Sequence, residues 1–239
     1  MEHINKILNR RSQRNYLNKE IEQEKIDAIF DVINSSPTCT NSHDYSAIVI
    51  TDKEVREKIS LNLPTQKHII DAPLFILFCA DTNRIDLVAQ SKQQEVCTDS
   101  FNSFLTASGD CFISATFAHN AALSLGLGAC FIGISRVSAS YLKEKLNLEN
   151  RMLPIIGLTI GYIEKENEIK PKINHVYFDK YDSSKVKQEI EEYDRRMLSY
   201  YDERNVNNKN AKWSDVCLKP YSIDTKELDD YYKKVWGLK

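Results

Sequence analysis

The sequence predicts a layered α/β protein, in which helices cover a sheet of short strands. Amphipathic helical patterns alternate with short apolar runs, and the composition is ordinary for a globular protein, with 42% hydrophobic and 28% charged residues. No run reaches the 18 or more apolar residues of a membrane span. At 239 residues, the chain is long enough for one domain with a large core.

Helices and strands are predicted in alternation over the first two thirds of the chain. The first helix has apolar residues at i, i+3, i+4 and i+7 and stops before Pro37, and the second begins at a capping box of Thr51 and Glu54. Residues 84–100 are polar and show no clear period. In order, the predicted elements are a helix over 20–34, a strand over 46–51, a helix over 52–61, a strand over 73–80, a helix over 101–125, a strand over 129–134, a helix over 138–146 and a strand over 153–163.

The longest predicted helix, over residues 101–125, is mostly apolar and rich in small residues. Such a helix usually lies at the centre of a large core or of a dimer interface. Gly126 or Gly128 is expected to end it in a left-handed conformation. The glycines that follow lack the Gly-x-Gly-x-x-Gly spacing and lead from a helix into a strand, so a Rossmann dinucleotide site is excluded.

The character of the chain changes after Lys172. Residues 183–203 are highly charged with Tyr and Ile interleaved, residues 204–212 are rich in Asn and Lys, and residues 221–239 form a short helical tail with Trp236. This tail is expected to wrap around the main body or a second subunit. Because there is no internal repeat or Gly/Ser linker, we expect one domain with a core over 1–180 and a C-terminal extension over 181–239.

Charge and ligand spacing exclude several classes of protein. A net charge of −2 argues against a general polyanion binder. The first residues lack the pattern of a signal peptide, so a cytoplasmic protein is expected. The six cysteines and five histidines have neither Cys-x-x-Cys nor His-Glu-x-x-His spacing, which argues against a metal site and a disulfide framework.

Two short basic clusters, about 160 residues apart, are the main candidate for a binding site. Arg and Lys in two groups that only the fold can bring together suggest one compact dianion, such as a phosphate monoester. The clusters also have simpler interpretations: solvated charges, pairing with Glu20, Glu22 and Glu24, or a charged turn around Pro171. A small nucleic-acid site at the N-terminal cluster is a further alternative. The cluster residues are Arg10, Arg11, Ser12 and Arg14, and Lys170 and Lys172.

Motifs along most of the chain resemble those of the nitroreductase superfamily, in particular its NADPH-preferring flavin reductases and oxygen-insensitive nitroreductases. The motifs are specific in their order and spacing together. They are Arg10-Arg11-Ser12-Gln13-Arg14, Ile50-Thr51-Asp52-Lys53, Gln66-Lys67-His68, Phe78-Cys79-Ala80-Asp81, Ser124-Leu125-Gly126-Leu127-Gly128 with Ile132-Gly133, Leu153-Pro154 with Gly157-Leu158, Gly161-Tyr162, Lys170-Pro171-Lys172 and Trp213-Ser214-Asp215.

This resemblance implies an α+β fold, with a mixed, mostly antiparallel sheet flanked by helices, in an intertwined homodimer with two FMN sites at the interface. The helix over 101–125 would be the dimer core. The residues implied to bind FMN are the basic ones around its phosphate, ribityl chain and pyrimidine edge, a Ser hydroxyl, a Gln at the ring, the strand along the flavin, and a segment that reaches the other subunit: Arg10, Arg11, Ser12, Arg14, Lys170, Lys172, Gln66, Phe131, Ile132, Gly133, Thr38, Cys39, Thr40 and Asn41.

The resemblance also implies an activity in which the flavin carries the chemistry and no side chain acts as a nucleophile or an acid–base pair. NADPH or NADH would reduce FMN, and an acceptor such as a nitroaromatic, a quinone or free flavin would be reduced in turn, with ping-pong kinetics. Arg14 is the candidate that stabilises the reduced flavin. Arg204 and Lys209 correspond to residues that grip the 2′-phosphate of NADPH, although their loop also fits a merely disordered polar segment.

Two alternatives to this activity stay open on the sequence. A dedicated FMN reductase would exchange flavin as a substrate instead of retaining it. A non-enzymatic flavin-binding or redox-sensing module would use the C-terminal loop to bind a partner.

Overall fold

The computed structural model describes residues 1–203 and 209–238 and divides the chain into two compact units. The first unit comprises residues Met1–Asn167 and Lys226–Lys239, and the second comprises Glu168–Thr225. The predicted division of the chain at residue 180 stays a prediction.

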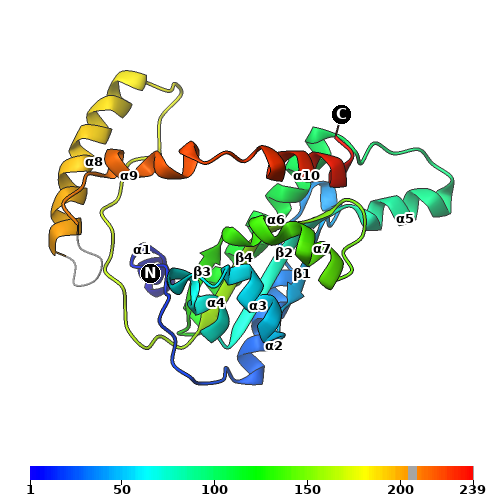
Figure 1. Cartoon of the computed structure of the whole chain (residues 1–239), viewed down its shortest axis with the longest axis horizontal. Coiled ribbons are helices and arrows are strands. Elements are labelled where there is room, and N and C mark those ends of the chain that lie inside the picture. Colours follow the sequence, from blue (N-terminus) through cyan, green and yellow to red (C-terminus); the bar gives the residue numbers. More distant parts are fainter. Residues whose placement is uncertain (204–208, 239) are drawn as a thin grey trace. The chain divides into compact units, whose positions relative to one another are not determined.

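The first unit is built on a four-stranded antiparallel sheet (Figure 1). The strands follow the spatial order β1-β2-β4-β3, so that β1 and β3 form the edges. A register shift between Phe78 and Cys79 interrupts the pairing of β2 with β4. The strands are β1 (Tyr45–Val49), β2 (Leu74–Asp81), β3 (Gly128–Ile132) and β4 (Met152–Gly161).

Helices cover both faces of this sheet. Alternation along β2 sends Ile76 and Phe78 into a cluster with α2, α6 and α10, and sends Phe75 and Leu77 into a second cluster with α3, α4 and α7. Burying each such side chain contributes about 1.5–3 kcal/mol. The helices are α1 (Glu2–Leu8), α2 (Gln23–Asn34), α3 (Lys53–Ser60), α4 (His68–Asp71), α5 (Asn83–Lys92), α6 (Phe101–Ser124), α7 (Ala139–Lys145) and α10 (Lys226–Trp236).

The predicted elements are present, with shifted ends and two corrections. The cap of α3 is Asp52, whose side chain accepts hydrogen bonds from the amides of Glu54 and Val55; the predicted capping box from Thr51 was wrong. Residues 83–92 form the unpredicted helix α5. Its Leu87 and Val88 are exposed, so its apolar residues do not form the buried stripe by which a helix is recognised in a sequence.

Helix α6 begins at the Ser100 cap and ends before Gly126, which has a φ of 76° and so takes the left-handed position predicted for Gly126 or Gly128. One face of α6 packs small residues, such as Ala107, Ala115 and Ala118, against the sheet. The opposite face exposes large apolar side chains, which are Leu105, Phe112, Ile113 and Phe117.

The C-terminal helix α10 belongs to the first unit. Trp236 is fully buried, its indole N–H donates to the Ser103 hydroxyl at 3.0 Å, and its ring packs edge-on against Phe104. The tail therefore packs on the body of its own chain, one of the two placements that the sequence left open.

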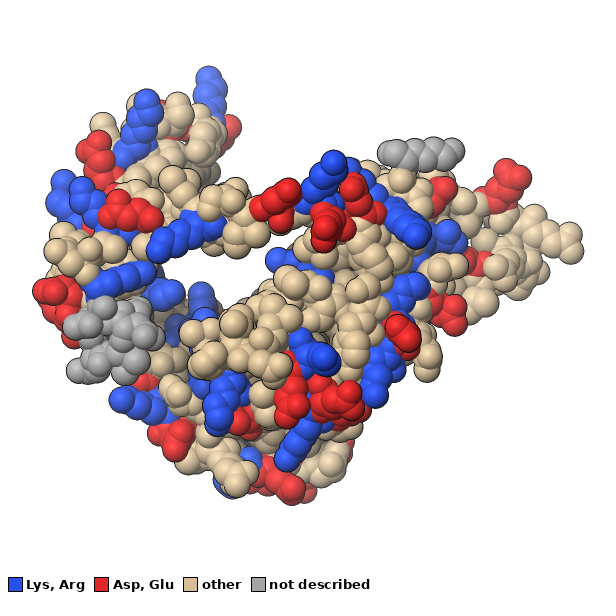
Figure 2. Space-filling model, in the orientation of Figure 1, with Lys and Arg blue, Asp and Glu red and all other residues tan. Residues whose placement is uncertain are grey.

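The second unit contains α8 (Ser183–Glu203) and the short helix α9 (Trp213–Cys217). The ring of Trp213 packs edge-on against Tyr193, and the Ser214 amide donates to the Asp194 carboxylate at 2.9 Å. On the face shown in Figure 2, basic side chains (blue) and acidic side chains (red) are interspersed. No helix in the described part of the chain is long and apolar enough to cross a membrane.

Candidate functional site

The N-terminal arginine segment lies along the edge strand β3. The Gln13 amide donates to the Ala129 carbonyl at 3.0 Å, and the Gln13 side chain occupies the space above Gly128, where a Cβ would lie 2.8 Å from Gln13 Cγ. On either side of Gln13, Ser12 and Arg14 lie close to the Cys130 thiol. Burial raises the pKa of that thiol, against the effect of the nearby Arg14 charge. The backbone pairing thus fixes this segment on the sheet.

The arginines of this segment differ in their partners. Arg11 forms a salt bridge with Glu166, with 2.9 Å between Nη1 and Oε2, and its buried Nε has no hydrogen-bond partner among the residues that the structure describes. In the described part of the chain, Arg10 and Arg14 form no salt bridge. Glu22 pairs with Lys19 and Lys25 instead. Two guanidinium groups are therefore available to an anion.

A second segment, carrying Gln66, lies near Arg14. Gln66 is half-buried in the 3₁₀ helix Pro64–Gln66, and His68 follows at the start of α4. Burial and then the charge of Arg14 lower the pKa of His68 to about 4, so its imidazole is neutral at neutral pH. The His68 Nε2 atom is buried and has no hydrogen-bond partner in the described part of the chain.

The end of β3 leaves space beside the backbone. Phe131 is 40% exposed and stacks on the buried His119 ring at 5.0 Å between centroids, whereas Ile132 is buried. Gly133 has a φ of −77° and a ψ of −25°, which any residue adopts. A Cβ on Gly133 would meet nothing closer than Arg136 Nη2 at 3.5 Å. Neither conformation nor crowding within the chain requires glycine here, which fits a ligand that approaches this backbone.

The segment Thr38–Asn41 precedes β1 and includes the 3₁₀ turn Cys39–Asn41. Thr40 and Asn41 have φ values of 49° and 59°. The Cys39 amide donates to Asp110 Oδ1 at 3.0 Å. Among the described residues, no hydrogen bond or salt bridge joins this segment to the arginine segment.

The remaining predicted basic residues belong to the second unit. Lys170 and Lys172 are exposed, and their approach to the arginines stays a prediction. The Lys209 amide donates to the Tyr201 carbonyl at 3.0 Å, and its ammonium lies 4.3 Å from the Tyr201 ring centroid. Arg204 lies outside the described residues.

Several site residues were not singled out in the sequence. Arg136 lies beside Gly133 and donates to the Ile155 carbonyl at 3.1 Å; His119 supports Phe131; His68 lies near Arg14. The sequence signal for His68 and Arg136 was their position just after Gln66 and Gly133. For His119 there was no signal beyond a histidine in an apolar helix.

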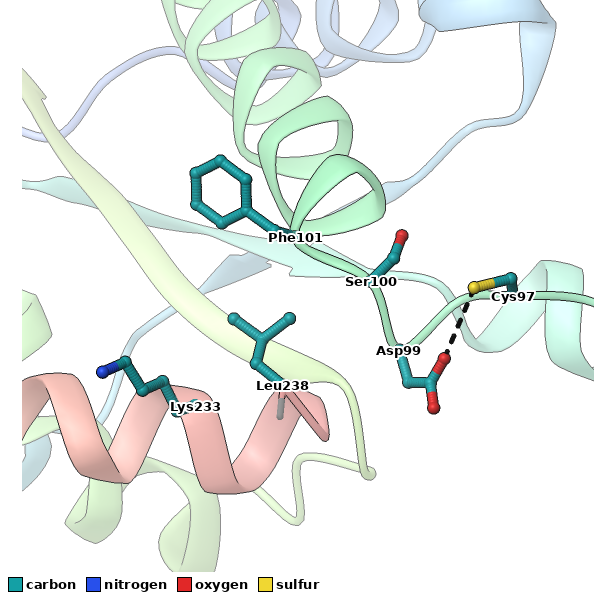
Figure 3. Close-up of a pocket in the computed structure, with 6 residues that line it drawn as sticks. All are labelled: Cys97, Asp99, Ser100, Phe101, Lys233 and Leu238. Atoms are coloured by element: carbon teal, nitrogen blue, oxygen red, sulfur yellow. Dashed lines mark hydrogen bonds between the residues drawn. The ribbon is translucent and has the colours of Figure 1, made fainter.

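A separate cavity of about 400 Å³ lies between the loop before α6 and the end of α10 (Figure 3). It is lined by Cys97, Asp99, Ser100, Phe101, Lys233 and Leu238, none of which belongs to the predicted site. The Cys97 thiol donates to Asp99 Oδ1 at 3.6 Å. In the described chain, no group of three or more His, Cys, Asp or Glu side chains is arranged to hold a metal ion.

An antiparallel sheet lies between helical layers, and an arginine-bearing segment runs along its edge strand β3, which defines an α+β protein. Residues 7–162 match the Nitroreductase family, and residues 170–235 match the C-terminal domain of that family. The chain therefore belongs to the Nitroreductase family, which confirms the resemblance inferred from the motifs.

Characterised relatives span nearly the whole chain. The FMN reductase [NAD(P)H] of Bacillus subtilis is 32% identical over 228 residues, covering 91% of this chain and 90% of its own length. The oxygen-insensitive NADPH nitroreductase of Salmonella typhimurium is 28% identical, covering 98% of both chains. The solved structure of NfrA2 from B. megaterium is 29% identical and superposes with a TM-score of 0.93, covering 100% of this chain and 98% of its own. This match confirms the predicted fold class.

Proposed function

We propose that this protein is an FMN-dependent NAD(P)H oxidoreductase with ping-pong kinetics. When bound, FMN supplies the chemistry, taking a hydride from NAD(P)H and passing electrons to an acceptor such as a nitroaromatic, a quinone or free flavin. Support comes from relatives named FMN reductase [NAD(P)H], oxygen-insensitive NADPH nitroreductase and NADPH-flavin oxidoreductase. The chain itself binds and orients the reactants.

Two features carry the proposal. Arginines without a salt bridge among the described residues lie in the segment along β3, and a glycine that its neighbours do not require follows the end of that strand. Arg10 and Arg14 lack salt bridges in the described chain, and a Cβ added at Gly133 would have Arg136 Nη2, at 3.5 Å, as its nearest neighbour. A cofactor with a planar ring and a phosphate fits this combination, since the ring needs close backbone approach and the phosphate needs forked donors. Ser12 and Gln66 add a hydroxyl and an amide for its polar edges.

Arg14 is the positive group placed to stabilise negative charge on a reduced ring. Its neighbour His68 is neutral at neutral pH, because burial and Arg14 itself lower its pKa to about 4. The charge at this point of the site therefore comes from the Arg14 guanidinium and not from the His68 imidazole.

The proposal includes a homodimer formed through α6. Leu105, Phe112, Ile113 and Phe117 are between 40% and 59% exposed on one face of the helix. On the same face, a Cβ at Gly109 would meet no atom within 4 Å. A second copy would cover this apolar face and would bring its Thr38–Asn41 segment to the flavin site.

Sedimentation analysis tests the dimer. Replacing Phe112 by Asp places a charge on the exposed face of α6, so we expect a monomer with little bound flavin. Leu61→Asp is the matched control, since Leu61 is similarly exposed at 41% but lies at the end of α3. A dimeric Phe112→Asp variant would contradict the assignment of this face.

Stopped-flow absorbance tests the activity. We expect anaerobic NAD(P)H to bleach the bound flavin near 450 nm (roughly the absorbance of oxidised flavin, a property of the cofactor), and an added acceptor to restore the colour. If the flavin stays oxidised for many seconds, the protein is a binding module and the oxidoreductase proposal fails. Loss of flavin during gel filtration would favour an FMN reductase that exchanges its flavin.

Lys170 and Lys172 are proposed to share the FMN phosphate with the arginines. We expect Lys170→Ala combined with Lys172→Ala to purify largely without flavin. The control is Lys185→Ala combined with Lys187→Ala, which removes the same charge from exposed positions of the same unit. Normal flavin content in the first variant would contradict the phosphate assignment.

A further inference from the structure

The segment before β1 is held in an unusual backbone conformation. Thr40, Asn41 and His43 have φ values of 49°, 59° and 57°, in the left-handed region that residues other than glycine rarely adopt. Three such residues within four positions persist only where surrounding contacts fix them. The question is which contacts do so.

Most hydrogen bonds of this segment are internal. The Ser42 hydroxyl donates to the Cys39 carbonyl at 2.7 Å, and the His43 amide donates to the Thr38 hydroxyl at 3.2 Å. One bond leads to the core helix α6: the Cys39 amide donates to Asp110 Oδ1 at 3.0 Å. Among the described residues, it is the one hydrogen bond that α6 makes with Thr38–His43.

Asp110 is an unusual residue for its place on α6. It is 2% exposed, it has no salt bridge among the described residues, and its Oδ2 atom is buried without a partner. Burying a carboxylate without a cation is unfavourable. A charged acceptor, however, forms a stronger hydrogen bond with a backbone amide than a neutral one does. Among its described contacts, the hydrogen bond that Asp110 accepts from the Cys39 amide is therefore the one that explains a carboxylate at this position.

We infer that Asp110 is a positioning residue for flavin binding: it holds Thr38–Asn41 in the conformation that completes the flavin site. The inference rests on the proposed function, in which this segment contributes to the site of a second copy. Asp110 follows Gly109 and precedes Phe112 by two residues on α6, so the same helix turn would carry both the dimer face and the anchor. Flavin affinity would then depend on one buried hydrogen bond.

Two substitutions remove this hydrogen bond from opposite sides. Asp110→Ala removes the acceptor. Cys39→Pro removes the donated amide hydrogen and leaves α6 intact; proline is tolerated in the first turn of a helix, and Thr38 already has the extended conformation, with φ −127° and ψ 157°, that a following proline requires. Cys39→Ser controls for loss of the thiol, and Asp110→Asn keeps a neutral acceptor.

The experiment measures the FMN dissociation constant of dimeric apoprotein by fluorescence quenching. We expect Asp110→Ala and Cys39→Pro each to weaken binding about tenfold, as for one hydrogen bond to a charged group, and the double variant to be no weaker than either. Asp110→Asn should recover most of the affinity. Cys39→Ser, which keeps the amide hydrogen, is the reference against which the further loss in Cys39→Pro is measured. Asp86→Ala, which removes a carboxylate bonded to Arg151 and Thr98, should lower stability without changing FMN affinity.

Additive losses in the double variant, or unchanged affinity in Cys39→Pro, would overturn the positioning role. If Asp110→Ala does not fold, Cys39→Pro still decides the question. The rate at which the exposed Cys39 thiol reacts with a disulfide reagent gives a second readout that needs no flavin, in a background with Cys97→Ser and Cys217→Ser. We expect it to rise severalfold in Asp110→Ala. If the unmodified protein binds no FMN, the proposed function fails, whereas this labelling rate still tests the anchor.

Discussion

Replacing Gly133 by alanine tests separately whether the stability of the fold and the binding of FMN require a glycine at the end of β3. The backbone of Gly133, with a φ of −77° and a ψ of −25°, suits alanine, and the added Cβ would have its nearest neighbour, Arg136 Nη2, at 3.5 Å. We therefore expect the apoprotein to be as stable as before, or more stable by about 0.4–1 kcal/mol, because alanine restricts the unfolded chain.

The flavin should respond in the opposite direction. A methyl group inserted where a ring contacts the backbone acts as overpacking, at a cost of about 1–3 kcal/mol. At 1.4 kcal/mol for each factor of ten, FMN binding should weaken about 5- to 140-fold. Fluorescence quenching of the apoprotein gives this affinity, and urea unfolding of the apoprotein gives the stability.

Gly128, the first residue of β3, provides the matched comparison for Gly133, which follows the last. Its Cβ would lie 2.6 Å from Ile163 Cγ1 and 2.8 Å from Gln13 Cγ, so Gly128→Ala should lower the stability of the apoprotein as well as displace the arginine segment. If Gly133→Ala binds FMN with unchanged affinity, no ligand approaches this backbone and the reasoning about Gly133 is refuted. A large loss of apoprotein stability in Gly133→Ala would refute it equally.

Three further predictions concern a buried cation, a buried histidine and the nucleotide. Arg56 donates from Nε to the Ile50 carbonyl at 2.7 Å and from Nη1 to the Ala72 carbonyl at 2.5 Å, so Arg56→Ala should lower the free energy of unfolding by about 2–4 kcal/mol in urea titrations, and an unchanged midpoint would contradict this. The pKa of His68 is lowered from 6.5 to about 4, so between these pH values the unfolded chain binds a proton that the folded chain does not. The stability of the apoprotein should therefore fall by about 2–3 kcal/mol as the pH drops from 6.5 to 4, and His68→Gln should remove that slope. Arg204→Ala should raise KM for NADPH more than for NADH, and equal increases would exclude a role in binding the 2′-phosphate.

Regular periodicity made much of the fold predictable. The helical spacing of Ile26, Ile29 and Ile33 predicted α2, and the apolar run before Asp81 predicted β2, because both elements bury their apolar residues in the core of their own chain. The prediction failed for a helix whose apolar residues are not buried at helical spacing. Helix α5 has exposed Leu87 and Val88, so its pattern did not reveal a helix.

The sequence also could not decide which of two neighbouring residues caps a helix. Thr51 and Asp52 are both good helix caps, and only the backbone path into α3 gives the amides of Glu54 and Val55 to Asp52. At the site, the order of motifs identified the residues, but not their partners. Arg11 pairs with Glu166, which lies 155 residues away, and this left Arg10 and Arg14 as the guanidinium groups without a salt bridge among the described residues.

By itself, then, the sequence determined the family, the layered architecture and the basic segments, because these follow from residue type and spacing along one dimension. The shared anion site of the two basic clusters stays a prediction, since Lys170 and Lys172 lie in a different compact unit from the arginines. Tertiary structure alone decided which face of α6 stays apolar and exposed, why Gly133 is free to carry a Cβ, and which carboxylate holds the Cys39 amide. Each of these depends on contacts between residues distant in the chain, which no local pattern encodes.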